Sequence, residues 1–540
     1  MNDVWIKIAA SLPCVCLFFT ATYRLLGVMQ QSGYKNTVFL KWMARKDNLF
    51  FNRLALWGGL SFFSTTIVAL CFSPLGVTAA QIASCVPFYL FCVLFLIADK
   101  KYALKVPVSG TNRIRRIGIV YVIFLAAACY LFIWALESLG ATIGNEIYDL
   151  FTYAPFSLIT SLLPFLLCAA NSIESLYSET KNKKYLKRAG QVLDESKQND
   201  GLLCVGIVGS YGKTSVKYAL EKILSVKYEV VATPKSFNTP MGIARTVLGE
   251  EFAGKKKKIF LAEMGARKRG DIEELCALVK PEWAIFTGVC PQHIESFGSE
   301  DEVLKTKCEI VRGAERVICG GALKTKMSAA GLIGGNCTFL DFSSVIENLC
   351  LRADGSEFTL KLGDDQIDVK TKLLGAHNAE NIAMAAALAK ELGLTAEEIK
   401  TGIDGLDYVP HRLELKRENG VYILDDGYNA NERGAKEAIA ALSRFNGKKI
   451  IVTPGIVECG VLEEKINGAF GAELARAEID KVILVGTTLV GAVKKGYLDG
   501  GGDEGKLVVC DTLEKAKSVF SAELCAGACI LFLNDLPDVY

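Results

Sequence analysis

The stretch Gly206-Ile-Val-Gly-Ser-Tyr-Gly-Lys-Thr-Ser215 decides the fold of the larger part of this chain. It follows the apolar run Leu202–Val205, which predicts a buried strand, and it precedes a helical pattern from about Thr214 to Leu224. A glycine-rich turn between a strand and a helix is a phosphate cradle, because backbone N–H groups point inward and the helix dipole favours anions. Lys213 adds a positive charge there, and the Thr214 hydroxyl can hold Mg²⁺.

The spacing of this loop is Gly-x-x-Gly-Lys-Thr. The commoner form has a further glycine five residues before the Gly-Lys pair, where Ile207 stands here. The alternative is an ordinary strand-to-helix turn, which does not explain why Lys and Thr both follow the glycine. We therefore predict a nucleotide-binding loop formed by Gly209, Ser210, Gly212, Lys213, Thr214 and Ser215.

The composition bounds the class of protein. A chain of 540 residues suggests several domains. The mean hydropathy of +0.28 is high for a soluble protein, and most of the excess lies before about residue 172. The formal charge of +2 indicates no strong attraction to nucleic acid. The 18 cysteines are scattered, with no Cys-x-x-Cys pair, and only three histidines are present. These counts argue against a zinc site and favour buried thiols in a reducing compartment.

Five apolar stretches before residue 172 are long enough to cross a bilayer, which needs about 20 residues each. They are Val4–Thr22, Leu54–Leu75, Val77–Ala98, Ile117–Leu136 and Leu150–Ala170. The first has features of a signal peptide, but Lys7 interrupts it and no small-residue cleavage site follows, so we interpret it as an anchor. Buried helices of a soluble domain are the alternative, and they would leave no polar face for solvent. We predict an α-helical membrane domain of about five spans over residues 1–172.

The charges of the loops predict an orientation. The loop after the fourth span carries Glu137, Glu146 and Asp149 and neither Lys nor Arg. The loops after the first and third spans are basic, with Arg24, Lys35, Lys41, Arg45, Lys46 and Arg53 in one and Lys100, Lys101, Lys105, Arg113, Arg115 and Arg116 in the other. The positive-inside rule then places the N-terminus outside the cell membrane and residues 172–540 in the cytoplasm. A cytoplasmic location agrees with a nucleotide site, and the lipid bilayer is an expected partner.

From residue 201 onward, apolar runs alternate with helical patterns, which is typical of parallel sheets covered on both faces. Residues 173–200 are charged with helical spacing and predict a connecting helix. We expect a central domain at 201–409 with a parallel sheet of the P-loop ATPase type, and a Rossmann-like C-terminal domain at 410–540. The predicted strands are Val230–Ala232, Lys258–Ala262, Ala284–Gly288, Arg316–Cys319, Val421–Leu424, Lys449–Val452, Lys481–Val485 and Cys529–Phe532.

Three further residues carry groups suited to chemistry near this loop. Glu263 ends a predicted strand, where a carboxylate beside a phosphate loop is well placed to bind Mg²⁺, although a surface salt bridge is the alternative. His293 follows the strand Ala284–Gly288, and a single histidine is more often structural than a ligand. Lys307 lies in an apparent helix and by itself reads as a solvated charge. The three histidines of the chain are His293, His377 and His411, all in this half and in loops marked by Gly, Asn or Pro.

At this point the chain resembles the Mur ligase family, the ATP-dependent amide-forming enzymes of peptidoglycan synthesis. The resemblance covers about residues 200–460 and rests on blocks that occur in the same order. The blocks are Gly209–Ser215, Ala262–Ala266, His293–Gly298, Lys305–Ile310, Gly375–Asn381 with Val409–Arg412, and Leu424–Asn431. The Glu-x-Gly-Ala and Tyr-Asn-Ala-Asn blocks look most like the family member that adds D-alanyl-D-alanine.

The resemblance implies roles for the residues around the phosphates. Lys213 would contact the β- and γ-phosphates of ATP, while Thr214 and Glu263 would hold one Mg²⁺. His293 would hold a second Mg²⁺. Lys307 matches the lysine that the family carbamylates with CO₂, which turns a cation into an anionic group that positions metal.

The resemblance also implies roles for residues near the adenine and ribose of ATP and near the two substrates. Asn378 and Asn381 match positions near adenine, Asp426 matches the contact to the ribose, and Arg412 would reach the phosphates from the C-terminal domain. The predicted substrate positions are Asn238 and Thr239 facing the acceptor, and Tyr428, Asn429 and Asn431 near the incoming amino component.

The chemistry implied by the family suits these groups. Transfer of the γ-phosphoryl group of ATP to a carboxylate gives an acyl phosphate, which an amine attacks to form an amide, ADP and phosphate. The protein must neutralise phosphoryl charge, which falls to Mg²⁺, Lys213 and Arg412, and it must position two substrates, which domain closure achieves. The acceptor is expected to be a muropeptide carboxylate, and the amino component an amino acid or a dipeptide.

Three departures from the family pattern bear on the substrates. Membrane spans replace the usual N-terminal domain that grips a UDP-sugar acceptor, the Lys-Gly-Ser block expected near the C-terminus is absent, and Gly427 stands where serine is usual. The acceptor is therefore either the UDP-linked tripeptide or a membrane-linked molecule. Two other functions remain open: an amino acid ligase of the polyglutamate type, against which the Tyr-Asn-Ala-Asn block argues, and an ATP-driven transporter or sensor, for which the spans offer no charged path.

Overall fold

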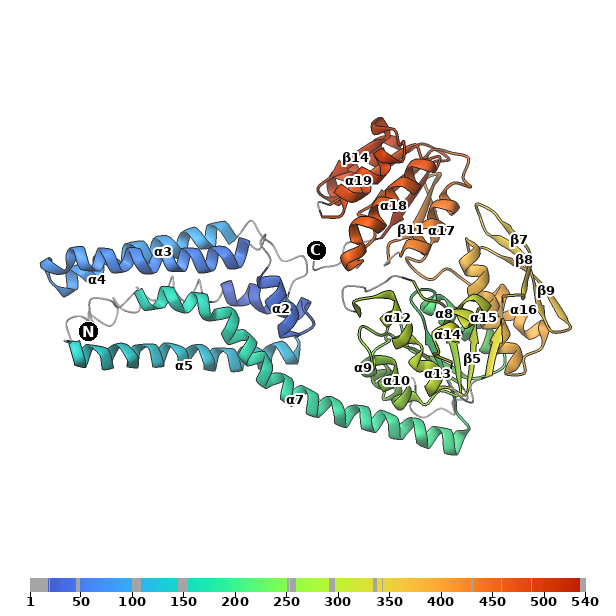
Figure 1. The fold of residues 1–540 in the computed structure, drawn as a ribbon, viewed down its shortest axis with the longest axis horizontal. Helices are drawn as coiled ribbons and strands as arrows, with labels where there is room; N and C mark the ends of the chain where they lie inside the picture. Colours follow the sequence, from blue (N-terminus) through green and yellow to red (C-terminus); the bar gives the residue numbers. More distant parts are fainter. Residues whose placement is uncertain are drawn as a thin grey trace. The chain divides into compact units, whose positions relative to one another are not determined.

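The computed structural model forms two compact units, Met1–Lys181 and Asn182–Asp538. It describes residues 18, 20–44, 49–99, 108–143, 154–249, 252, 259–290, 297–333, 338–341, 343–428, 431–457, 459–486 and 488–534. Figure 1 shows the first unit as a set of helices and the second as helices with sheets.

Helices build the first unit. They are α2 (Asn36–Met43), α3 (Leu49–Phe72), η1 (Ser73–Leu75), α4 (Val77–Asp99), α5 (Asn112–Ile143) and the first part of α7 (Ala154–Asp200). Leu25, Phe88, Ile117 and Leu163 come from different segments and pack in one apolar core. Large apolar side chains also cover the outside of the helices, as at Leu60, which is 59% exposed. An apolar exterior favours a hydrocarbon environment over water.

Among the described residues, three helical segments are long and apolar enough to cross a membrane: Leu54–Leu75, Val77–Phe95 and Ile159–Asp200. They correspond to the second, third and fifth predicted spans. The fourth prediction, Ile117–Leu136, falls on α5, a long helix that is not one of the three. The first prediction, Val4–Thr22, lies almost wholly outside the described residues.

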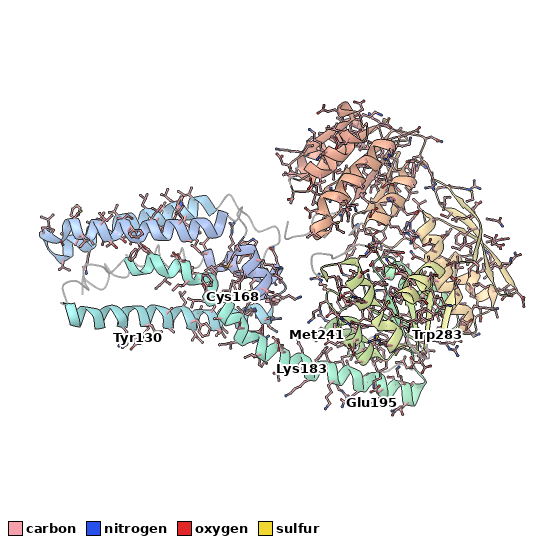
Figure 2. All side chains as sticks on the ribbon, in the orientation of Figure 1. Tyr130, Cys168, Lys183, Glu195, Met241 and Trp283 are labelled. Atoms are coloured by element: carbon pink, nitrogen blue, oxygen red, sulfur yellow. The ribbon has the colours of Figure 1, made fainter. Side chains whose placement is uncertain are left out.

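Helix α7 runs without a break from the fifth predicted span through the predicted connecting helix. Within the first unit, Glu174 of α7 is buried and forms ion pairs with Arg113 and Arg116 of α5, at 2.9 and 2.6 Å. Later in the helix, Lys183 and Glu195 are exposed, and both are labelled in Figure 2. The change from apolar to charged residues along one helix explains why the sequence suggested two separate elements.

A six-stranded parallel sheet forms the core of the central domain, which we define as β1 to α16. Its order is β2-β3-β1-β4-β5-β6, so the strand before the glycine-rich loop is central. The strands are β1 (Leu203–Val208), β2 (Val230–Ala232), β3 (Ile259–Glu263), β4 (Trp283–Phe286), β5 (Arg316–Cys319) and β6 (Thr338–Asp341). The helices among them are α8 (Lys213–Leu224), α9 (Pro240–Val247), α10 (Asp271–Val279), α12 (Glu300–Lys307), α13 (Glu309–Gly313) and α14 (Gly321–Ala329).

Two apolar cores cover the faces of this sheet. On one face, α8 packs with α15 (Ala376–Glu391), α16 (Ala396–Asp404) and a small antiparallel sheet. That sheet contains β7 (Ile346–Leu351), β8 (Ser356–Leu362) and β9 (Asp365–Thr371), which the sequence analysis did not predict. Helix α15 contains a run of alanines, most of which are buried. On the other face, α9, α10 and α13 pack with the end of α7.

The end of α7 is part of the second unit's core. Ala189 and Leu193 are buried in the same core as Cys204 of β1 and Val279 of α10. The Lys197 ammonium donates to Glu282 Oε1 over 2.6 Å, and the other oxygen of Glu282 accepts the Cys204 N–H. The last turns of α7 therefore pack against the strand that precedes the glycine-rich loop and are linked to it by hydrogen bonds through Glu282.

The C-terminal domain, β10 to β15, has its own six-stranded sheet with the order β10-β11-β15-β12-β13-β14. All pairs are parallel except β10 with β11. The strands are β10 (Glu414–Glu418), β11 (Val421–Asp426), β12 (Lys449–Thr453), β13 (Lys481–Val485), β14 (Leu507–Cys510) and β15 (Cys529–Leu533). The helices are α17 (Glu432–Leu442), η2 (Gly460–Leu462), α18 (Glu463–Arg476), α19 (Val490–Asp499), η3 (Glu504–Lys506) and α20 (Leu513–Glu523). The two expected α/β domains are thus present, drawn in green to yellow and in orange to red in Figure 1.

Candidate functional site

The glycine-rich loop connects β1 to α8 at the carboxyl edge of the central sheet. Gly212 precedes the helix with φ 73°, a left-handed conformation that favours glycine. A Cβ at this position would lie 2.8 Å from Asn381 Oδ1, so the loop passes close to α15. A Cβ at Gly209 would lie 1.9 Å from Thr287 Oγ1, which leaves no room for a side chain there either. The backbone can therefore approach a ligand at the start of α8, as phosphate binding requires.

Two lysines converge on this loop. The Lys213 ammonium donates to the Gly209 carbonyl over 2.8 Å, and the Lys307 ammonium donates to the same oxygen over 2.9 Å. Lys307 is 3% exposed, which corrects the view of an isolated solvated charge. Burial lowers the pKa of Lys307 to about 7, with a further contribution from the nearby Lys213. Burial also lowers the pKa of Lys213.

Glu263 ends β3 beside the loop and is 1% exposed. Its Oε2 accepts hydrogen bonds from Thr214 Oγ1 and from the Lys217 ammonium, each over 3.0 Å. Its Oε1 faces Asn238 Nδ2 at 3.5 Å. A hydroxyl and a carboxylate side by side are hard oxygen donors of the kind that Mg²⁺ prefers. The residues predicted to hold a magnesium ion thus lie together, and the donor set fits that ion.

Asn378 and Asn381 lie on the first turns of α15 and are buried. Asn381 Nδ2 donates to Asn378 Oδ1 over 3.3 Å, while Asn378 Nδ2 donates to the Leu374 carbonyl over 2.9 Å. Both side chains line a narrow hollow together with Ser215 of α8 and Arg412. The hollow adjoins the phosphate loop, and in this structure it has room for no more than about one water molecule.

Two predicted residues of the C-terminal domain, Tyr428 and Asp426, lie near Arg412. Its guanidinium is 4.4 Å from the centre of the Tyr428 ring, and its Nη1 donates to the Tyr428 carbonyl over 2.8 Å. Asp426 accepts the Leu413 N–H over 3.1 Å. Burial raises the pKa of Asp426, opposed by the charges of His377 and Arg412. The Tyr428 hydroxyl reaches Ser236, in the loop that carries Asn238, at 3.0 Å.

Arg433 joins the phosphate loop to the C-terminal domain. Arg433, in the first turn of α17, donates from Nη1 to the Tyr211 hydroxyl and from Nη2 to Glu380 Oε2, each over 2.6 Å. The Arg433 guanidinium also lies 4.8 Å from the centre of the Tyr211 ring. No sequence pattern indicated a role for Lys217, Tyr211, Glu380 or Arg433. The position of Tyr211 inside the Gly-x-x-Gly-Lys-Thr loop was the available signal.

Several predicted ligand residues make local contacts instead. Ser210 is buried and its hydroxyl donates to the Cys290 carbonyl over 3.3 Å. Thr239 and Asn431 accept backbone N–H groups at the starts of α9 and α17, over 3.2 and 2.9 Å. Side chains used as helix caps are less free to bind substrate. His293 and Asn429 lie outside the described residues.

The remaining histidines lie near the domain boundary. His377 is in the first turn of α15, with Nδ1 3.6 Å from a Glu437 carboxylate oxygen. His411, Glu414 and Asp425 come close enough together to suggest a metal site. However, the Lys416 ammonium already pairs with Glu414 and Asp425 at 3.1 and 3.0 Å. We interpret this group as a salt-bridge network.

Family models and individual relatives both match the two α/β domains of this chain. Residues 207–389 match the Mur ligase middle domain, and residues 411–533 match the Mur ligase glutamate ligase domain. The chain is 30% identical over 298 residues to the UDP-N-acetylmuramoyl-tripeptide--D-alanyl-D-alanine ligase of Bacillus subtilis (strain 168), covering 54% of this chain and 64% of that one. It is 31% identical over 294 residues to the ligase of the same name from Escherichia coli (strain K12), covering 52% and 64%. The chain thus spans a little under two thirds of the length of these curated relatives.

Solved structures show the same fold. MurF from Acinetobacter baumannii has a TM-score of 0.58 at 23% identity, covering 66% of this chain and 78% of that one. MurF ligase from Thermotoga maritima in complex with ADP has a TM-score of 0.56 at 24% identity, covering 66% and 81%. The fold match therefore extends over the central and C-terminal domains.

Proposed function

Because this chain belongs to the Mur ligase family, we propose that it is an ATP-dependent amide ligase of peptidoglycan precursor synthesis. It adds D-alanyl-D-alanine, or a related amino component, to the carboxylate of a muropeptide. The observation that carries the proposal is the grouping of Lys213, Lys307 and the Thr214–Glu263 pair around one glycine-rich loop. Lys213 neutralises phosphoryl charge directly, and Thr214 with Glu263 would do so through a bound Mg²⁺, which is the main task of a protein that catalyses phosphoryl transfer.

The chain's own residues divide the work of binding ATP. The N–H groups at the start of α8 and Lys213 bind the β- and γ-phosphates, and Asn378 and Asn381, on the first turns of α15, are the residues that would lie near the base. Thr214 and Glu263 hold a Mg²⁺ ion, which neutralises phosphate charge when bound. Arg412 provides a further positive charge from the C-terminal domain.

Lys307 has the surroundings that carbamate formation needs. The reaction with CO₂ requires a neutral amine, and burial together with Lys213 lowers the pKa of Lys307 to about 7. The carbamate on Lys307 would be an anion next to the Lys213 ammonium. It would replace the repulsion between two ammonium groups with an attraction. We propose that carbamylated Lys307 then helps to position metal, with His293 as the second metal's ligand.

The reaction proceeds through an acyl phosphate. The acceptor carboxylate attacks the γ-phosphorus and ADP leaves; the amine then attacks the acyl carbon, and phosphate leaves with one oxygen of the former carboxylate. Asn238 lies beside Glu263 on the acceptor side. Tyr428 and Ser236, from the two domains, are in contact, so closure of the domains would bring the acceptor and the amino component together.

The apolar helices before the ligase domains support a location at the cell membrane. We propose a multi-pass protein with its N-terminus outside and its ligase domains in the cytoplasm, on the basis of the loop charges. The acceptor is then either UDP-linked or lipid-linked. Labelling of single introduced cysteines in intact and permeabilised cells tests this topology.

A ligation screen tests the proposed function. Full-length protein in detergent or vesicles is mixed with ATP, Mg²⁺, UDP-linked or lipid-linked muropeptides, and D-alanyl-D-alanine or single amino acids. Mass spectrometry should find an amide product, and phosphate release should require both substrates. Products with glutamate would favour a polyglutamate-type ligase, and hydrolysis that is indifferent to both substrates would argue for a transporter or sensor.

A further inference from the structure

Lys217 is a buried lysine that the roles described above do not use. It lies in α8, one turn after Lys213, and it is 4% exposed. A lysine ammonium is rarely buried unless it is paired, because leaving water costs a charge its hydration. The partners of Lys217 therefore show what it does.

The Lys217 ammonium has one partner at the end of a strand and another in the loop after a neighbouring strand. One is Glu263 Oε2, at 3.0 Å, at the end of β3. The other is the carbonyl of Lys235, in the loop after β2. Lys235 has φ 48°, a left-handed conformation that a lysine adopts only with compensation, and this hydrogen bond supplies one. Lys217 thus joins the metal-binding carboxylate to the loop that carries Asn238.

The two oxygens of Glu263 differ as a result. Oε2 accepts from both Thr214 and Lys217, whereas among the described residues Oε1 has only the long contact to Asn238 Nδ2, at 3.5 Å. The loop is also tied back to β3, because the Gly265 N–H donates to the Asn238 carbonyl over 2.8 Å. The orientation of the carboxylate and the path of residues 234–239 are therefore set by the same ammonium group.

We propose that Lys217 is a positioning residue that fixes the Glu263 carboxylate and the acceptor loop in one arrangement. This inference rests on the proposed function of Glu263 and Asn238. It assigns Lys217 no contact with ATP, metal or acceptor. Its effect passes through Glu263 to the metal and through the Lys235 carbonyl to the acceptor loop.

Lys217→Met tests the proposal, because methionine keeps most of the length of the side chain and removes its charge and donors. Loss of a partner that orients a metal ligand typically costs about 10-fold to 100-fold in metal affinity or activity. We expect the Mg²⁺ concentration for half-maximal ligation and the acceptor KM each to rise about tenfold or more. Binding of ADP without Mg²⁺ should stay within about twofold, because the loop amides and Lys213 hold the phosphates.

Lys222→Met is the matched control, since Lys222 is an exposed lysine on the same helix. A double-mutant cycle with Asn238→Ala separates positioning from general stability: the two changes should raise the acceptor KM by less than the product of their separate effects. If Lys217→Met is too unstable to purify, Lys217→Gln keeps a donor and should show the same pattern in smaller measure.

Two results would overturn the proposal. One is a Lys217 variant whose acceptor KM and Mg²⁺ requirement equal those of the wild type. The other is an effect that multiplies fully with that of Asn238→Ala. The wild-type ligation assay is run first and separately, so a failure of the proposed function shows as no product from any substrate, whatever residue stands at position 217.

Discussion

Lys213 and Lys307 donate hydrogen bonds to one oxygen atom, the carbonyl of Gly209, over 2.8 and 2.9 Å. One lysine opens α8 and the other closes α12, so the fold brings together two positive charges that are far apart in the chain. Like charges in a buried place are unfavourable: burial lowers the pKa of both ammonium groups, and the charge of Lys213 lowers the pKa of Lys307 further. A nearby negative charge would stabilise the two ammonium groups. The phosphates of ATP would supply such a charge, and so would a carbamate on Lys307.

Replacement of Lys307 should abolish ligation. Lys307→Arg keeps the positive charge but cannot form the carbamate, and Lys307→Ala removes both, so we expect neither variant to be restored by bicarbonate. Carbon-13 NMR of wild-type protein in labelled bicarbonate should show one carbamate signal that both variants lack. Full activity in either variant would remove the carbamate hypothesis.

The stability of the protein should rise with pH through the range that Lys307 controls. Its pKa is about 7 in the folded protein and about 10.5 when exposed, so between these values the unfolded chain binds a proton that the folded chain does not. Unfolding midpoints in CO₂-free buffer should therefore increase from pH 7 to pH 9 more for the wild type than for Lys307→Met. Parallel curves for the two proteins would mean that Lys307 is not titrating in this range.

Gly212→Ala should weaken ATP binding. The added Cβ would lie 2.8 Å from Asn381 Oδ1, so either the loop or Asn381 must move away from the nucleotide. A binding cost of about 1.4 kcal/mol lowers affinity tenfold, and calorimetry measures it directly.

Gly270→Ala is the control for this variant, because Gly270 has φ 87° but open space around its Cβ position. It should cost about 1–2 kcal/mol of folding stability from backbone strain and leave ATP affinity unchanged. Equal ATP affinities for the two glycine variants would show that the Asn381 contact is unimportant.

Arg433→Met should slow ligation more than it weakens nucleotide binding. Arg433 joins α17 to Tyr211 and Glu380 of the central domain, so its loss loosens the arrangement of the domains. Misplacement of reacting groups costs up to about a hundredfold in rate, and we expect kcat to fall within that range. Lys436→Met is the control, since Lys436 pairs with Glu432 within α17. Similar kinetics for Arg433→Met and Lys436→Met would contradict a role of Arg433 in positioning the two domains.

A soluble fragment should begin at residue 182 and not at residue 201. Ala189 and Leu193 of α7 are buried in the core, and Lys197 and Asp194 form ion pairs with Glu282 and Lys280. Exposing the equivalent of one leucine costs about 1.5–3 kcal/mol. Urea unfolding of fragments 182–540 and 201–540 should show this loss in the shorter one, and equal stabilities would place α7 outside the core.

Much of the fold follows from local patterns in the sequence. The strands Val230–Ala232 and Arg316–Cys319 were predicted to the residue, because buried parallel strands are continuous apolar runs. Strand β10 has the sequence Glu-Leu-Lys-Arg-Glu and lies at a sheet edge, so it carries no such run. The sheet β7-β8-β9 was missed for a related reason, since one face of it is open to water.

The site was predicted where chain order alone brings residues together. Thr214 and Glu263 follow neighbouring strands of one parallel sheet, so their contact is a consequence of topology. The roles of Lys217 and Arg433 depend on tertiary packing, because a lysine or arginine inside a helix looks the same in sequence whether it faces water or a carboxylate. Helix α7 was divided in two because its composition changes while its backbone does not.

The most direct test of the central claim uses an acceptor whose carboxylate carries oxygen-18. If the chain activates this carboxylate by phosphoryl transfer, one labelled oxygen should appear in each phosphate released, and only when D-alanyl-D-alanine or another accepted amine is present. Mass spectrometry of the phosphate measures the transfer. Unlabelled phosphate from a protein that turns over ATP would contradict the account, because water and not the carboxylate would then be the attacking group.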